Sequence, residues 1–243
     1  MKSLEVADVE KGYRTPEGMR RVVLQVDEFS VEHGEHVALR GASGSGKTTF
    51  LNLIAGIVAA DAGRIVVAGR EMSRRFEAER DRIRASCIGY VFQSFNLLEA
   101  YTALENVVLG MSFGGRADVS RARELLERME LGSRAHHHPS QLSVGQQQRV
   151  AIARAIAARP ALVLADEPTG NLDPAAAQNA VRLIREVCSE TGAALLLVSH
   201  DDRILARFDR CCDLEVLNVA ERPPGQGRPG PVGSDGPRAA AAP

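Results

Sequence analysis

The sequence predicts an α/β fold in which a parallel sheet with flanking helices is joined by an N-terminal antiparallel β subdomain and an inserted α-helical subdomain. Residues 161–165 and 194–198 are apolar throughout, which is typical of strands covered on both faces. Residues 4–10 and 21–31 instead alternate in polarity, as strands with one exposed face do. Between residues 94 and 160 the apolar spacing becomes helical, and we expect no strand there.

The elements follow in order along the chain. Residues 15–18 separate the two alternating segments and contain proline and glycine, so we expect a turn between antiparallel strands. Further short strands are expected at residues 36–40, 64–68 and 88–92, and helices at residues 102–110, 118–130 and 144–158. We expect one domain over residues 1–220 with the helical insertion at about 94–160, and a disordered tail over 221–243, which holds six of the eleven prolines.

Composition excludes several classes of function. The net charge is -1 and the 30 basic residues form no stripe, so no nucleic-acid partner is expected. The four cysteines lack the C-x-x-C spacing and are expected to be reduced thiols. Uninterrupted apolar runs are much shorter than the roughly 20 residues of a membrane span, so any membrane role is expected to come through a partner.

Residues Gly41–Thr48 match the phosphate-binding pattern G-x-x-x-x-G-K-[ST] at every fixed position. The motif lies between an apolar strand and a segment with helical spacing, as a P-loop NTPase requires. Its backbone N–H groups and the helix N-terminus attract phosphate, while Lys47 reaches the β- and γ-phosphates. The residues expected to contact nucleotide here are Gly41, Ala42, Ser43, Gly44, Ser45, Gly46, Lys47, Thr48 and Thr49.

Two carboxylates end the apolar run at residues 162–165. In a P-loop protein the first of them, Asp166, usually helps to hold Mg²⁺ together with the hydroxyl group of Thr48, and the second, Glu167, can polarise the attacking water. The sequence therefore predicts a site for ATP and Mg²⁺ with Glu167 as the base or water-positioning group.

Further segments identify the chain as similar to ABC transporter ATPases. Residues 142–155 closely resemble the ABC signature, residues 170–173 the D-loop and residues 198–201 the switch histidine. Gln93 matches the Q-loop, and Tyr13 lies where the family stacks an aromatic ring on adenine. The resemblance covers about residues 2–218 in the order of the family.

The resemblance implies a homodimer in which each ATP lies between two subunits. Ser143, Gly145 and Gln146 would bind the ATP held by the opposite subunit, and Val144 replaces the commoner glycine of the signature. The catalytic residues implied are Lys47, Gln93, Glu167 and His200, with Thr48, Gln93 and Asp166 as the Mg²⁺ ligands. Ser143 could instead be a helix cap alone, although a cap does not explain Gly145 in the first helical turn, where glycine is unfavourable.

Residues 92–107 resemble the subgroup that serves lipoprotein release, macrolide export and cell division. This implies a separate integral-membrane permease as partner and a peripheral position on the cytoplasmic face of the inner membrane. A non-transport ABC ATPase, such as a cell-division regulator or a soluble translation or repair factor, stays open as the alternative. Three consecutive histidines, His136–His138, cannot readily converge on one metal ion, so no site is expected there. Residues 211–215 replace the glycine-turned closing hairpin of the family.

Overall fold

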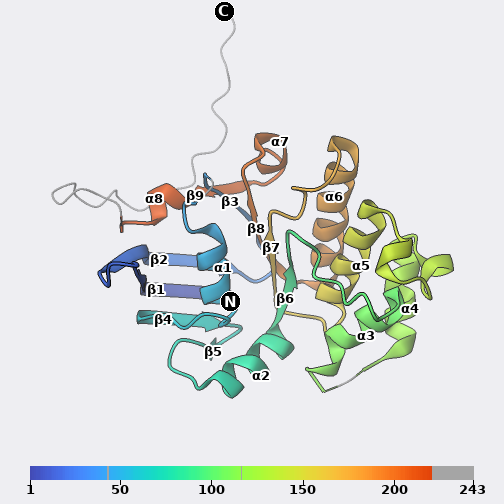
Figure 1. Cartoon of the computed structure of the whole chain (residues 1–243), viewed down its shortest axis with the longest axis horizontal. Coiled ribbons are helices and arrows are strands. Elements are labelled where there is room, and N and C mark those ends of the chain that lie inside the picture. The colour runs from blue at the N-terminus through green and yellow to red at the C-terminus, as the bar shows by residue number, and fades with distance from the viewer. Residues whose placement is uncertain (43, 116, 221–243) are drawn as a thin grey trace, which may run out of the picture.

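Two sheets and a group of helices make up the computed structural model, which describes residues 1–42, 44–115 and 117–220 (Figure 1). The antiparallel sheet has the order β2-β1-β4-β5, and the parallel sheet has the order β6-β7-β8-β3-β9. The α/β class and both kinds of sheet are thereby confirmed. The antiparallel strands are β1 (Lys2–Arg14), β2 (Arg20–Glu32), β4 (Ala62–Val67) and β5 (Arg70–Glu71), and the parallel strands are β3 (His36–Arg40), β6 (Ile88–Val91), β7 (Leu162–Asp166), β8 (Ala194–Ser199) and β9 (Arg210–Asp213).

The helices lie mainly around the parallel sheet. They are α1 (Lys47–Ile54), α2 (Glu77–Cys87), α3 (Ala103–Ser112), α4 (Val119–Arg128), α5 (Val144–Ile156), α6 (Pro174–Thr191), α7 (Asp202–Leu205) and α8 (Leu214–Leu217), with short 3-10 turns at Gly132–Arg134 and Pro139–Gln141. The three helices expected in the middle block are confirmed as α3, α4 and α5, and no strand is found among the described residues between 94 and 160. The run expected as a strand at 64–68 joins the antiparallel sheet as β4.

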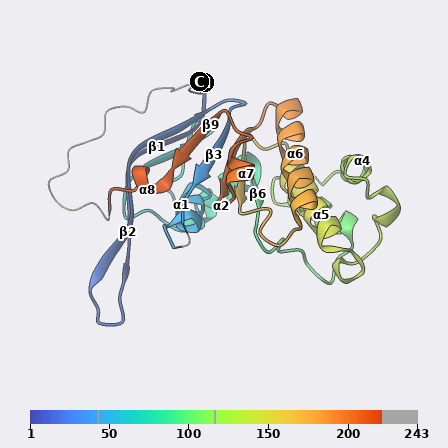
Figure 2. The same cartoon turned by 90° about the horizontal axis from the view of Figure 1, so that it is seen from above.

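The parallel sheet separates two apolar cores. On β7, Leu162 and Leu164 face the core shared with α1 and the antiparallel sheet, while Val163 and Ala165 face the core shared with α5 and α6. Because successive side chains of a strand point to opposite faces, a strand between two cores must be apolar at every position. Figure 2 shows α5 and α6 on one side of the sheet and the antiparallel strands on the other.

The middle helices form the lobe at the right of Figure 1, where α3 packs against both α4 and α5. Thr102 and Glu105 form a capping box at the start of α3, and Ser143 and Gln146 form another at the start of α5. Each box satisfies backbone N–H groups that a helix start leaves free, which fixes where the helix begins. The division into one domain with an inserted subdomain stays a prediction, and the tail at 221–243 lies outside the described residues.

Residues 211–215, which replace the closing hairpin of the family, lie in a strand and a short helix. Residues 210–213 form β9, which pairs in parallel with β3 at the sheet edge, and α8 follows directly. Asn218, just after α8, lies beside β2. Its side chain accepts a hydrogen bond from the N–H of Gln25 and donates one to the backbone oxygen of Val23, at 2.9 Å each. All four cysteines are free thiols.

Gly89 on β6 provides a test of this packing. A Cβ atom there would lie 2.2 Å from the backbone oxygen of Ala155 on α5, so Gly89→Ala must push the helix away from the sheet. We expect a loss of about 3 kcal/mol in the free energy of unfolding, measured by urea denaturation. Gly145→Ala is the matched control, because a Cβ atom at Gly145 meets nothing within 4 Å. Equal stability of the two variants would contradict the close packing of β6 against α5.

Candidate functional site

Four neighbouring strands of the parallel sheet bring the predicted residues together at one edge. The strands run in the order β6-β7-β8-β3, and their carboxyl ends meet at the same side because they are parallel. Gln93 follows β6, Asp166 ends β7 with Glu167 next, His200 follows β8, and the phosphate loop follows β3. The sequence-predicted residues that lie far apart in the chain therefore share one edge of the sheet.

The phosphate loop has the backbone that an anion cradle needs. Gly44 and Gly46 have φ values of 83° and 95°, a left-handed conformation that side chains oppose. A Cβ atom on Gly41 would lie 2.6 Å from Ser45 Oγ and 3.0 Å from Lys47 Cγ, so a larger residue there would displace side chains of the loop. Ser45 Oγ is itself buried without a hydrogen-bond partner among the described residues, so the loop has a polar atom to offer a phosphate. Ser43 lies outside the described residues.

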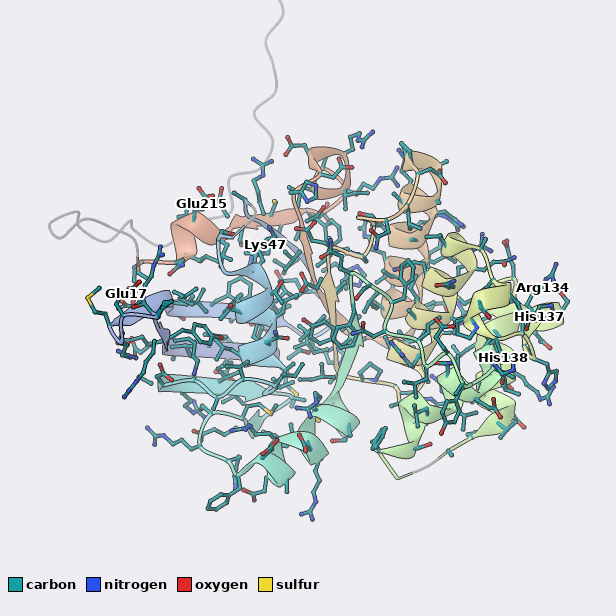
Figure 3. All side chains as sticks on the ribbon, viewed as in Figure 1. Glu17, Lys47, Arg134, His137, His138 and Glu215 are labelled. Atoms are coloured by element: carbon teal, nitrogen blue, oxygen red, sulfur yellow. The ribbon has the colours of Figure 1, made fainter. Side chains whose placement is uncertain are left out.

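Lys47 is buried at the start of α1 and lies at the centre of the site (Figure 3). Its ammonium group donates to the backbone oxygens of Gly41 and Ala42 at 2.8 Å each. The same nitrogen forms an ion pair with Glu167 Oε1 at 3.1 Å. The cation thus sits between the loop and the carboxylate, where the terminal phosphates of a nucleotide would meet it.

Glu167 contacts both Lys47 and His200. Its second oxygen, Oε2, lies 2.6 Å from Nδ1 of His200, whose side chain is 65% exposed. The backbone of Glu167 is left-handed at φ 42°, and its N–H donates to the oxygen of Val198 at 3.0 Å. A residue held in this unfavourable conformation is a feature of functional sites, and here it aims the carboxylate at both partners.

Asp166 and Thr48 fit a hard cation. Burial raises the pKa of Asp166, the hydrogen bond from the Thr48 side chain opposes that rise, and the charge of Glu167 adds to it. A carboxylate and a hydroxyl group are the oxygen ligands that Mg²⁺ prefers, and a divalent cation would offset the crowding of negative charge. The donor set of this chain therefore fits the predicted Mg²⁺.

The segment after Gln93 is held by two residues that the sequence analysis did not single out for this role. Asn171 donates from its side chain to the backbone oxygen of Gln93 at 3.1 Å. Arg154 of α5 donates to the oxygens of Phe95 and Asn96 at 2.6 and 2.5 Å, and both of these residues have left-handed backbones. Gln93 is thus linked to Asn171, and the residues that follow Gln93 are linked to α5. The sequence signal for both residues is that they lie in segments resembling family motifs. Their hydrogen-bond partners become visible only in the fold.

Ser143, Gly145 and Gln146 lie apart from this cluster, at the start of α5. The side-chain oxygen of Ser143 accepts from the N–H of Gln146 at 3.3 Å, while the Gln146 side chain accepts from the N–H of Ser143 at 2.9 Å. The structure thus confirms that Ser143 caps the helix. The space around Gly145 is open, and Val144 is 48% exposed.

Tyr13 lies on β1 and is 44% exposed. The histidine cluster lies elsewhere: Figure 3 places His137 and His138 at the far side of the helical lobe from Lys47. In the ranges that the structure describes, no group of three or more His, Cys, Asp or Glu residues could hold a metal ion. Within those same ranges, no helix is both long and apolar enough to cross a bilayer.

Comparison with known proteins agrees with this geometry. The family model described as ABC transporter matches residues 24–170. The chain is 43% identical to the lipoprotein-releasing system ATP-binding protein LolD 2 of Caulobacter vibrioides, over 87% of this chain and 94% of the relative. It is 40% identical to LolD of Ruegeria sp., over 90% of this chain and 98% of that protein.

Solved structures extend the similarity to three dimensions. A dimeric ATP-binding cassette in a post-hydrolysis state, bound to ADP and Pi, superimposes with a TM-score of 0.80 at 36% identity and covers 90% of this chain and 97% of its own. A second dimeric bacterial ABC transporter cassette gives a TM-score of 0.79 at 36% identity, over 86% of this chain and 93% of its own. The chain therefore belongs to the ABC transporter family, as one of its ATP-binding cassette ATPases.

Proposed function

We propose that the chain hydrolyses ATP as a homodimer and thereby drives a transporter of the lipoprotein-releasing type. The observation that carries the proposal is the linked set Lys47–Glu167–His200 beside the phosphate loop. In the dimer, ATP lies between residues 41–48 of one protomer and residues 143–146 of its partner. The exposed start of α5 supports this arrangement, because its open N-terminal turn presents N–H groups and the positive end of the helix to an anion.

Hydrolysis in this site needs a base next to a phosphate clamp. Lys47 and the loop N–H groups bind the β- and γ-phosphates. Thr48, Asp166 and Gln93 would hold Mg²⁺, which would neutralise phosphate charge. Glu167 accepts a proton from water as the water oxygen attacks the γ-phosphorus. The bond from that phosphorus to the β–γ bridging oxygen then breaks, releasing ADP and phosphate. His200 orients the Glu167 carboxylate and the γ-phosphate.

Coupling to transport follows from the segment after Gln93. Leu98 and Tyr101 are 42% and 43% exposed, in a loop that the buried Asn106 organises through hydrogen bonds to the backbone of Leu98, Tyr101 and Thr102. This loop is the proposed contact for a separate integral-membrane permease, which would hold the cassette at the cytoplasmic face of the inner membrane. The relatives named as lipoprotein-releasing ATP-binding proteins support lipoproteins as the cargo.

Glu167→Gln tests the assigned base. The amide cannot accept the water proton, so we expect steady-state phosphate release to fall at least about 100-fold while ATP binding persists. Size-exclusion chromatography with ATP should then show a trapped dimer. Glu186→Gln on the exposed face of α6 is the matched control and should hydrolyse ATP normally. Near-normal turnover by Glu167→Gln would refute the role of this carboxylate.

Ser143→Ala separates the cap from the proposed contact with ATP. Thr102 caps α3 by the same arrangement, so Ser143→Ala and Thr102→Ala should each lose about 1 kcal/mol of stability. In the Glu167→Gln background, Ser143→Ala should also fail to form the ATP-dependent dimer, whereas Thr102→Ala should form it. Thermal melts and chromatography check both effects. A dimer in both variants would mean that Ser143 serves as a cap alone.

A further inference from the structure

Asp61, in the loop after α1, ties that loop to both strands of the N-terminal hairpin. Its carboxylate accepts hydrogen bonds from Lys11 Nζ at 2.8 Å, from the backbone N–H of Gly12 at 2.9 Å and from Arg20 Nη2 at 2.9 Å. Lys11 also donates to the oxygen of Ala59 at 2.9 Å. One carboxylate thus fixes the position of β1 and β2 relative to the end of the loop.

Lys11 in turn fixes an aromatic ring. Its ammonium nitrogen lies 5.4 Å from the centroid of the Tyr13 ring, within the range of a cation–π interaction. Residues two apart along a strand point to the same side, which explains why Lys11 and Tyr13 meet. The lysine side chain is 14% exposed, whereas Tyr13 is 44% exposed. The Tyr13 ring is therefore contacted by Lys11, and part of its surface stays exposed to solvent.

The neighbouring strand β2, paired with β1 at this pair, touches the phosphate loop. The register of β1 and β2 shifts between Lys11 and Gly12, which lie opposite Leu24 and Val22, so Val23 occupies a bulge. The backbone oxygen of Val23 is 3.6 Å from the position of a Cβ atom on Gly46. β-Bulges often redirect side chains beside active sites, and this one lies where the hairpin touches the loop. Figure 2 shows the hairpin continuing from there beyond the rest of the molecule.

We propose that Lys11 and Asp61 are positioning residues for the nucleotide base: Asp61 holds Lys11, and Lys11 holds the Tyr13 ring in the orientation that stacks on adenine. The inference rests on the proposed ATPase function and on the expectation, from the resemblance to the family, that Tyr13 stacks on the base of ATP. It adds that the base contact depends on the charged pair Lys11–Asp61. The phosphates do not take part in it, because they bind to the loop and Lys47.

The test compares two ligands of the full chain. Isothermal titration measures the affinity for ATP, which has a base, and for inorganic tripolyphosphate, which has none. Lys11→Met should weaken ATP binding about 3- to 10-fold, because the cation–π interaction that orders the ring is lost. Asp61→Asn should weaken it in the same direction, and both variants should bind tripolyphosphate as the wild type does.

Three further variants separate positioning from a general effect on the fold. Lys11→Arg retains a cation and should recover much of the ATP affinity. Lys2→Met removes a lysine from the exposed start of the same strand and should bind ATP normally. Lys11→Met combined with Tyr13→Ala should bind ATP no more weakly than Tyr13→Ala alone, because the lysine acts through the ring.

Each contrary result overturns the proposal in a recognisable way. Unchanged ATP binding in Lys11→Met, or additive losses in the double variant, would show that the lysine does not act through Tyr13. Equal losses for ATP and tripolyphosphate would indicate damage to the phosphate site. If Tyr13→Ala itself bound ATP normally, the base contact would be wrong, although turnover and its loss in Glu167→Gln would still support the proposed ATPase.

Discussion

The burial of the parallel sheet on both faces is the constraint on which the site depends. When both faces of a strand are buried, polar side chains can reach solvent only at its ends. The functional side chains therefore lie at the carboxyl edge of the sheet. β7 illustrates this: four apolar residues with no exposed face lead directly into Asp166 and Glu167. The two cores hold the strands in register, and the register brings Lys47, Glu167 and His200 into contact.

Segments whose residue types match their environment could be predicted from the sequence. β7 and β8 are apolar because both faces are buried, and the phosphate loop needs glycine where its backbone is left-handed. β9 was not predicted, because its residues Arg210–Asp213 are polar or small and it lies at the sheet edge with one side unpaired. α2 has few apolar residues and buries only Cys87, so its sequence lacks the usual amphipathic pattern.

The contacts within the site were predictable in part. Family motifs indicated which residues converge at the sheet edge, but the bonds of Arg154 to Phe95 and Asn96 join segments about sixty positions apart in the chain and depend on how α5 crosses the sheet. The same holds for Asp61, which no motif identifies. Arg154 links the start of the loop proposed to contact the permease to α5, the helix that Ser143 caps. A rotation of that helix would carry the loop with it, so the nucleotide and the proposed permease contact share one rigid link.

The carboxylate of Asp61 also bears on how the hairpin responds to acid. Burial alone would raise the pKa of Asp61, but the hydrogen bonds from Lys11, the Gly12 N–H and Arg20 outweigh it and lower the pKa to about 2. Because the folded pKa is depressed, the contribution of these bonds to stability is complete above the ordinary aspartate value and disappears only as the pH falls through about 2. Mild acidification would therefore leave the bonds between the two β-strands and the loop after the first helix intact, even where exposed carboxylates elsewhere had already been neutralised.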